Sequence, residues 1–129
     1  MIANTKIARK NMIDTQLFTN QVSDKNVLEV MGIVPREEFV SADCKKTAYL
    51  DEDIDMGGGR SLCAPLTTAR MIQAAELNGT EKVLEIGSLA GYTTCLLGML
   101  AESVVAIDDS SKLLGSGSEN LVKLGVNNA

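Results

Sequence analysis

The 129-residue sequence contains no histidine, and its three cysteines, Cys44, Cys63 and Cys95, form no Cys-x-x-Cys pair. Without histidine the usual general base is missing, which excludes Ser-His and Cys-His nucleophilic catalysis. The odd number and wide spacing of the cysteines argue against a zinc site and a disulfide framework. We therefore expect reduced thiols and no bound metal.

Long apolar runs and basic runs are also absent. No stretch reaches the ~20 apolar residues of a spanning helix, and polar residues interrupt the N-terminus before a signal-peptide core accumulates. We expect a cytoplasmic protein with no membrane partner. The net charge is −5, and only Arg9-Lys10 and Lys45-Lys46 are adjacent basic pairs. A nucleic-acid partner is not expected, because no basic stripe matches a phosphate backbone.

The chain does contain enough apolar sequence for one compact core. Hydrophobic residues make up 45% and charged residues 22%, which is ordinary for a globular protein. The length fits a single domain. Within it we predict an N-terminal helical region with a glycine-rich substrate and cofactor loop over residues 1–65, and an α/β core over residues 66–129.

Helical spacing dominates the first forty residues, where apolar residues recur four apart. Ser23 is expected to cap a second helix that Gly32 ends. Thr67 or Thr68 is expected to cap a later helix that runs through Leu77.

Residues 48–65 lack helical periodicity and include three successive glycines, 57–59. We predict a loop, and two interpretations stay open. The glycines allow the backbone to pass close to another group, or they form a flexible connection.

Two short β-branched runs, residues 82–86 and 103–107, flank a predicted helix from about 91 to 101. This order predicts a parallel βαβ unit with a right-handed crossover, and hence an α/β fold. A last helix is predicted to end at Gly125. Gly115 and Gly117 lie inside it and each costs about 1 kcal/mol relative to alanine, which predicts fraying of its first turns.

The first predicted strand runs into Glu85-Ile-Gly87-Ser-Leu89-Ala-Gly91, at the edge where open parallel sheets bind ligands. The spacing follows E-x-G-x-G-x-G, which resembles S-adenosylmethionine-dependent methyltransferases, rather than the G-x-G-x-x-G of dinucleotide binding. Asp108 ends the second strand and is the expected acceptor for ribose hydroxyls. Two alternatives stay open: the glycines merely form a tight turn and Asp108 caps the next helix, or the unit is half of a nicotinamide-dependent oxidoreductase.

Longer segments carry a more specific resemblance. They are Ala8-Arg-Lys-Asn-Met-Ile-Asp-Thr-Gln-Leu17, Val34-Pro-Arg-Glu-Glu-Phe-Val40, Ala48-Tyr49, the loop from Gly57 to Pro65, and Val83 to Gly87 through Gly91-Tyr92. On these residues the sequence resembles the protein-L-isoaspartate O-methyltransferases over nearly its whole length. The resemblance implies a Rossmann-like methyltransferase core, here an incomplete βαβα, with an N-terminal helical region. It also implies methyl transfer from S-adenosylmethionine to the carboxylate of L-isoaspartyl residues in damaged proteins, a repair reaction.

The resemblance assigns site residues as well. It places at the cofactor Ser61, Leu62, Glu85, Gly87, Ser88, Leu89, Gly91 and Asp108. Cys63 occupies the position of the family's active-site serine. The reaction would need few catalytic side chains, because a carboxylate is already a nucleophile and the sulfonium an activated donor, so catalysis would rest on positioning.

Three residues depart from the family's pattern. Cys63 is a weaker hydrogen-bond donor than serine. Leu66 replaces a histidine or aromatic residue, and Leu89 replaces the middle glycine of the cofactor loop, which predicts weakened cofactor binding. The chain also ends before the further strands and the Gly-Asp-Gly segment of family members, as a fragment or a shortened relative would.

These departures leave two hypotheses. In the first, the chain is a methyltransferase of the isoaspartate-repair type. In the second, it is a degenerate or truncated non-catalytic homologue that acts as a binding or assembly module. An open sheet edge would favour a homo-oligomer in either case, because unpaired strand edges attract partners.

Overall fold

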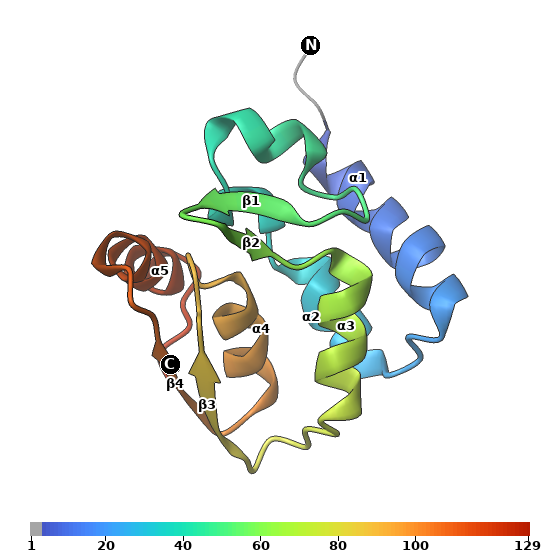
Figure 1. Ribbon diagram of the computed structural model, residues 1–129. Coiled ribbons are helices and arrows are strands. Elements are labelled where there is room, and N and C mark those ends of the chain that lie inside the picture. Colours follow the sequence, from blue (N-terminus) through green and yellow to red (C-terminus); the bar gives the residue numbers. More distant parts are fainter. Residues whose placement is uncertain (1–3) are drawn as a thin grey trace. The chain divides into compact units, whose positions relative to one another are not determined.

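The computed structural model describes residues 4–129. The chain divides into two compact units, unit 1 (Met1–Ala75) and unit 2 (Glu76–Ala129), whose elements are labelled in Figure 1. The predicted division into residues 1–65 and 66–129 separates regions by their expected function, and it stays a prediction.

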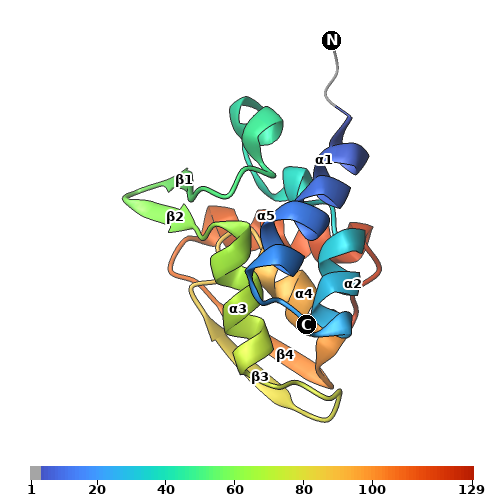
Figure 2. The same cartoon turned by 90° about the vertical axis from the view of Figure 1, so that its right-hand side faces the viewer.

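Unit 1 is mainly helical. Its helices are α1 (Thr5–Asn11), which continues into a π-helical stretch (Met12–Leu17) and a 3₁₀ turn (Phe18–Asn20), then α2 (Lys25–Ile33), two 3₁₀ segments (Arg36–Phe39 and Ala42–Thr47) and α3 (Pro65–Ala74). The three α-helices pack beside one another (Figure 2). The π-helical stretch buries Met12 and Leu17, α2 buries Val27 and Met31, and α3 buries Ala69 and Ile72.

The helix boundaries of unit 1 differ from the predicted ones. Asp24, not Ser23, caps α2, because its Oδ1 accepts hydrogen bonds from the second and third amides of the helix. Gly32 lies inside α2 rather than ending it. α3 begins at Pro65, ahead of the predicted threonine caps, which suits proline because its missing amide hydrogen needs no partner in the first turn. It ends at Ala74, before the predicted end.

The segment predicted as a loop forms an antiparallel hairpin of β1 (Ile54–Gly57) and β2 (Arg60–Leu62). Gly57, Gly58 and Gly59 make its turn with φ values of 85°, 62° and 74°. Side chains rarely adopt this left-handed region, whereas glycine does so at little cost. The three glycines are therefore explained by the backbone path of the turn.

Unit 2 is a βαβα unit. Its elements are β3 (Lys82–Ile86), α4 (Tyr92–Leu100), β4 (Ser103–Ile107) and α5 (Ser111–Lys123). β3 and β4 are parallel, in register from Lys82 opposite Ser103 to Ile86 opposite Ile107. Both strands have the predicted bounds. α5 is helical from its first turn and is capped by Ser110, so the predicted fraying is not observed.

The two faces of the β3–β4 sheet differ. The side chain of Glu85 points toward α4, where it bonds Thr94. Since strand side chains alternate, the opposite face carries Leu84, Ile86, Val105 and Ile107, and all four are exposed. We call these four residues the apolar sheet face. The outer edge of β4 is partly paired, because the Val104 amide donates to the Asn128 carbonyl (2.9 Å).

None of the helices in residues 4–129 is long and apolar enough to cross a membrane.

Candidate functional site

The turn after β3 is tied to the end of β4. The amides of Gly87 and Ser88 both donate to the Ile107 carbonyl, at 2.8 and 3.2 Å. Gly87 (φ 84°) and Gly91 (φ 95°) take left-handed backbone conformations, which allow the strand to turn and α4 to start within a few residues. Both glycines therefore have backbone roles in the turn, and their contact with a cofactor stays a prediction.

Gly91 and Gly117 also permit α5 to approach this turn. A Cβ on Gly91 would lie 3.2 Å from the Cα of Gly117, and a Cβ on Gly117 would lie 3.3 Å from the carbonyl group of Ala90. Gly117 is buried at this crossing. The glycine that looks unfavourable inside a helix therefore has a packing role.

Leu89 occupies the tightest point of the turn with φ 51°, a left-handed conformation. For a residue with a side chain this conformation costs roughly 1–2 kcal/mol. Its side chain is only 8% exposed. It lines a cavity of about 110 Å³ together with residues of α4, β4 and α5, including Thr94, Ala106 and Leu114. The isobutyl group is thus accommodated inside unit 2.

Asp108 holds Leu89 in place. Its Oδ2 accepts the amide of Leu89 (2.8 Å), and its Oδ1 accepts the amide of Ser110 (2.9 Å). The carboxylate therefore joins the loops that follow the two strands. Asp108 does not itself cap α5, because the capping side chain is that of Ser110. Asp108 instead accepts the amide of this capping residue.

Glu85 is a second carboxyl group at the same end of the sheet. Burial raises its pKa above the ordinary value, the hydrogen bond donated by the Thr94 hydroxyl opposes this shift, and the nearby charge of Asp108 adds to it. Thr94 itself is almost fully buried. The pair Glu85 and Thr94 fixes the inner face of β3 to α4.

Ser61, Leu62 and Cys63 lie in unit 1, at the end of the hairpin. Ser61 and Cys63 are exposed, whereas the Leu62 side chain between them is buried. Two residues apart on an extended chain, Ser61 and Cys63 face the same side. Leu62 could contact a cofactor only through its backbone, since its side chain is packed in the interior.

The structure brings together the predicted site residues of unit 2, namely Glu85, Gly87, Ser88, Leu89, Gly91 and Asp108. Those of unit 1 form their own group on the hairpin. Sequence reasoning missed Thr94, the buried partner of Glu85, and Arg36, which donates to the Cys63 carbonyl. Thr94 has no local sequence signal, because its contact with Glu85 forms only on folding. Arg36 lies in the segment of residues 34–40 that carries the family resemblance, but its contact with Cys63 also forms only on folding.

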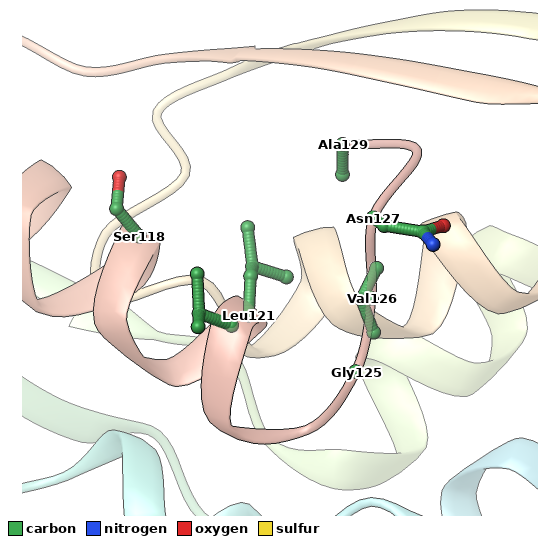
Figure 3. Close-up of a pocket in the computed structure, with 7 residues that line it drawn as sticks. Ser118, Leu121, Gly125, Val126, Asn127 and Ala129 are labelled. Carbon is green, nitrogen blue, oxygen red and sulfur yellow. The ribbon is translucent and has the colours of Figure 1, made fainter.

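The Cys95 thiol and a hollow beside α5 lie outside the predicted site. Burial raises the pKa of the Cys95 thiol to about 11, so it stays protonated at neutral pH and is a poor nucleophile. A hollow of about 410 Å³ lies between the end of α5 and residues 125–129 (Figure 3). Its lining includes no charged side chain that could bind an ionic ligand. Within residues 4–129, no three histidine, cysteine or acidic residues cluster as metal ligands.

Comparison with known proteins identifies the family. The profile of the protein-L-isoaspartate (D-aspartate) O-methyltransferase family matches residues 7–129. Protein-L-isoaspartate O-methyltransferase 2 of Anaeromyxobacter sp. is 41% identical over 93% of this chain and 49% of its own length. Protein-L-isoaspartate O-methyltransferase 1 of Syntrophobacter fumaroxidans is 38% identical over 97% of this chain and 58% of its own. The chain thus spans about half the length of the curated relatives it matches.

Solved structures agree with this result. A protein-L-isoaspartate O-methyltransferase superposes with a TM-score of 0.80 at 25% identity, over 93% of this chain and 40% of the other. A putative enzyme of the same name from Plasmodium falciparum, solved with S-adenosyl-L-homocysteine, gives a TM-score of 0.73 at 19% identity, over 98% of this chain and 61% of the other. The second likeness supports the fold alone. The α/β, Rossmann-like methyltransferase core with an N-terminal helical region is confirmed, and the chain belongs to the protein-L-isoaspartate (D-aspartate) O-methyltransferase family.

Proposed function

We propose that this chain takes part in methyl transfer from S-adenosylmethionine to the carboxylate of L-isoaspartyl residues in proteins. The observation that carries the proposal is the contact between Asp108 and the Leu89 amide. It fixes the glycine turn and an acidic side chain at the carboxyl ends of two parallel strands, where open α/β sheets bind nucleotide ligands. Membership of the family supports the same reaction.

The residues of unit 2 fit the proposed cofactor. A carboxylate accepts up to about four hydrogen bonds, so the two amides on Asp108 are compatible with further donors such as ribose hydroxyls. Gly87 is exposed and has no side chain to obstruct a ligand that lies over the strand ends. The 110 Å³ cavity beside Leu89 is smaller than the roughly 300 Å³ of an ordinary ligand pocket, so it is not the cofactor site itself.

S-adenosylmethionine would supply an electrophilic methyl group. The protein would bind the cofactor and the substrate, orient the two reacting groups and exclude water from them. In unit 2, Asp108 would hold the ribose and the turn from Gly87 to Gly91 would limit the position of the methionine part. In unit 1, the segment of Ser61 and Cys63 is the one that the family resemblance assigns to the substrate carboxylate. Proximity of this kind is worth roughly 7–11 kcal/mol at its upper range. The isoaspartyl-protein substrate and the cytoplasmic location remain parts of the proposal.

The test is transfer of radiolabelled methyl groups from S-adenosylmethionine to a synthetic peptide that contains one L-isoaspartyl residue. The same peptide with ordinary aspartate is the substrate control. Asp108→Asn is the variant, because it removes the charge and replaces one acceptor oxygen with a donor. We expect label in the isoaspartyl peptide only and a loss of at least about tenfold in Asp108→Asn. Equal labelling of both peptides, or none in either, would refute the proposed reaction.

A second proposal rests on the apolar sheet face of Leu84, Ile86, Val105 and Ile107, which is exposed. Parallel sheets are ordinarily covered on both faces. This exposure favours an assembly role in which the chain associates with itself, and such a role does not require catalysis.

A further inference from the structure

Arg36 is the most completely buried charged residue of unit 1, with 0% of its surface exposed. Burying a guanidinium without hydrogen-bond partners is costly, so its contacts indicate its role. Nε donates to the Ala48 carbonyl (2.6 Å), and Nη2 donates to the Cys63 carbonyl (2.9 Å). One rigid, planar group therefore joins the backbone before the hairpin to the backbone after it.

The Cys63 segment, residues 62–66, is held at four of its five residues. Leu62 pairs with Ile54 in the hairpin. The Cys63 carbonyl accepts from Arg36. The amides of Ala64 and Leu66 donate to the carboxylates of Asp53 (2.8 Å) and Asp51 (3.1 Å). Four residues of the segment are thus held through their backbone, while Cys63 itself stays exposed.

Arg36 is itself anchored on its other side. Its amide donates to the Tyr49 hydroxyl (3.0 Å), which donates in turn to Glu37. Arg9 donates to the same hydroxyl (2.9 Å) and forms an ion pair with Glu37 (3.4 Å). Arg9 contacts Tyr49, Glu37 and the Ile33 carbonyl, all of which lie outside the Cys63 segment, so the two arginines can be separated by experiment.

We propose that Arg36 is a positioning residue that fixes the Cys63 segment at the place where the isoaspartyl carboxylate is bound. The inference rests on the proposed function for the identity of the substrate. Arg36 acts through the Cys63 carbonyl and never touches the substrate. Lysine cannot replace it, because a single ammonium does not reproduce the fork that reaches two carbonyls at once.

The test compares Arg36→Lys with Arg9→Lys, the same chemical change made on the other side of the network. Amide hydrogen exchange is followed by NMR at Ala64 and Leu66 and, for reference, in α1 and α2. We expect Arg36→Lys to speed exchange at these two amides at least about tenfold, the size expected when a charged hydrogen bond is lost, and to leave the helices within about twofold. Arg9→Lys should leave both amides at the wild-type rate. An unchanged rate in Arg36→Lys, or an equal increase throughout unit 1, would overturn the proposal.

A measurement on the unaltered protein covers the case in which Arg36→Lys does not fold. Bonded to the Cys63 and Ala48 carbonyls, the Arg36 side-chain N–H groups should give resolved, slowly exchanging signals at neutral pH. Rapid exchange with solvent would contradict the contacts on which the proposal rests.

The link to the substrate has its own readout. With the isoaspartyl peptide, Arg36→Lys should raise KM about tenfold and change kcat less, while the affinity for S-adenosylhomocysteine stays the same. Faster exchange with an unchanged KM would overturn the link between Arg36 and substrate binding. If neither wild type nor variant methylates the peptide, the proposed function fails, and the exchange experiment still decides whether Arg36 fixes the segment.

Discussion

Leu89 shows how one side chain can occupy a position that ordinarily needs glycine. Its backbone is left-handed, but the residue is buried beside a cavity that α5 also lines, and its amide is bonded to Asp108. Burial of a leucine contributes roughly 1.5–3 kcal/mol, which offsets the conformational cost of roughly 1–2 kcal/mol. Leu89 is thus part of the packing that shapes the cofactor loop, and the weakened cofactor binding expected from its side chain stays a prediction.

Glu85 makes stability depend on pH. Its pKa is raised from 4.5 in the folded protein, mainly by burial. The folded state therefore holds the Glu85 proton more tightly than the unfolded chain does. The contribution of Glu85 to the free energy of unfolding is thus largest below pH 4.5 and is lost as the pH rises through the folded pKa. Glu85→Gln should remove this loss. The measurement is the free energy of unfolding in urea at pH 4 and pH 7. If this free energy changes equally between the two pH values in wild type and in Glu85→Gln, Glu85 does not titrate in this way.

The cysteines should differ in reactivity. Cys63 is exposed, whereas Cys95 is buried and its pKa is raised to about 11. Treatment of the native protein with iodoacetamide at pH 7.5, followed by peptide mass spectrometry, should modify Cys63 at least about tenfold faster than Cys95. Both should react equally in urea. Comparable rates in the native protein would mean that α4 opens readily or that Cys63 is covered.

At the scale of the element, α5 contains two glycines with opposite roles. Nothing lies within 4 Å of a Cβ built on Gly115, whereas a Cβ on Gly117 meets the backbone of Ala90. Gly115→Ala should raise the free energy of unfolding by up to about 1 kcal/mol. Gly117→Ala should lower it by about 1–3 kcal/mol, because the helix must move away from the turn. Urea denaturation of the two variants checks this pair. Stabilisation by both would indicate that α5 is not pressed against the glycine turn.

The same elements show what a sequence can predict. Periodicity and β-branched runs predicted β3, β4 and the helix between them, because these patterns reflect burial within each element. The start of α3 was placed too late because the two threonines were expected to cap it, whereas the helix begins at Pro65. The amides of Ala64 and Leu66 are held by Asp53 and Asp51, contacts that form only on folding. The cap of α2 was misplaced by one residue because serine and aspartate are equally good caps. Gly117 looked unfavourable because its partner, the turn at Ala90, is a tertiary contact.

At the scale of the whole molecule, the apolar sheet face predicts self-association. Leu84 and Val105 are paired by register, as are Ile86 and Ile107, so the four exposed side chains form one continuous surface. Ile86→Lys should shift the protein toward the monomer in sedimentation velocity at micromolar concentrations. Val122→Lys, at an exposed apolar residue of α5 outside this face, is the control and should have little effect. A wild-type protein that stays monomeric at all concentrations would contradict this prediction.

The turn after β3 and Asp108 should together form a working part of a cofactor site. Isothermal titration with S-adenosylhomocysteine tests it directly, with wild type, Asp108→Asn and Leu89→Gly compared under the same conditions. Saturable binding by wild type, weakened at least about tenfold in Asp108→Asn and retained in Leu89→Gly, is the predicted result. No binding by either wild type or Leu89→Gly would contradict the claim and favour the assembly role instead.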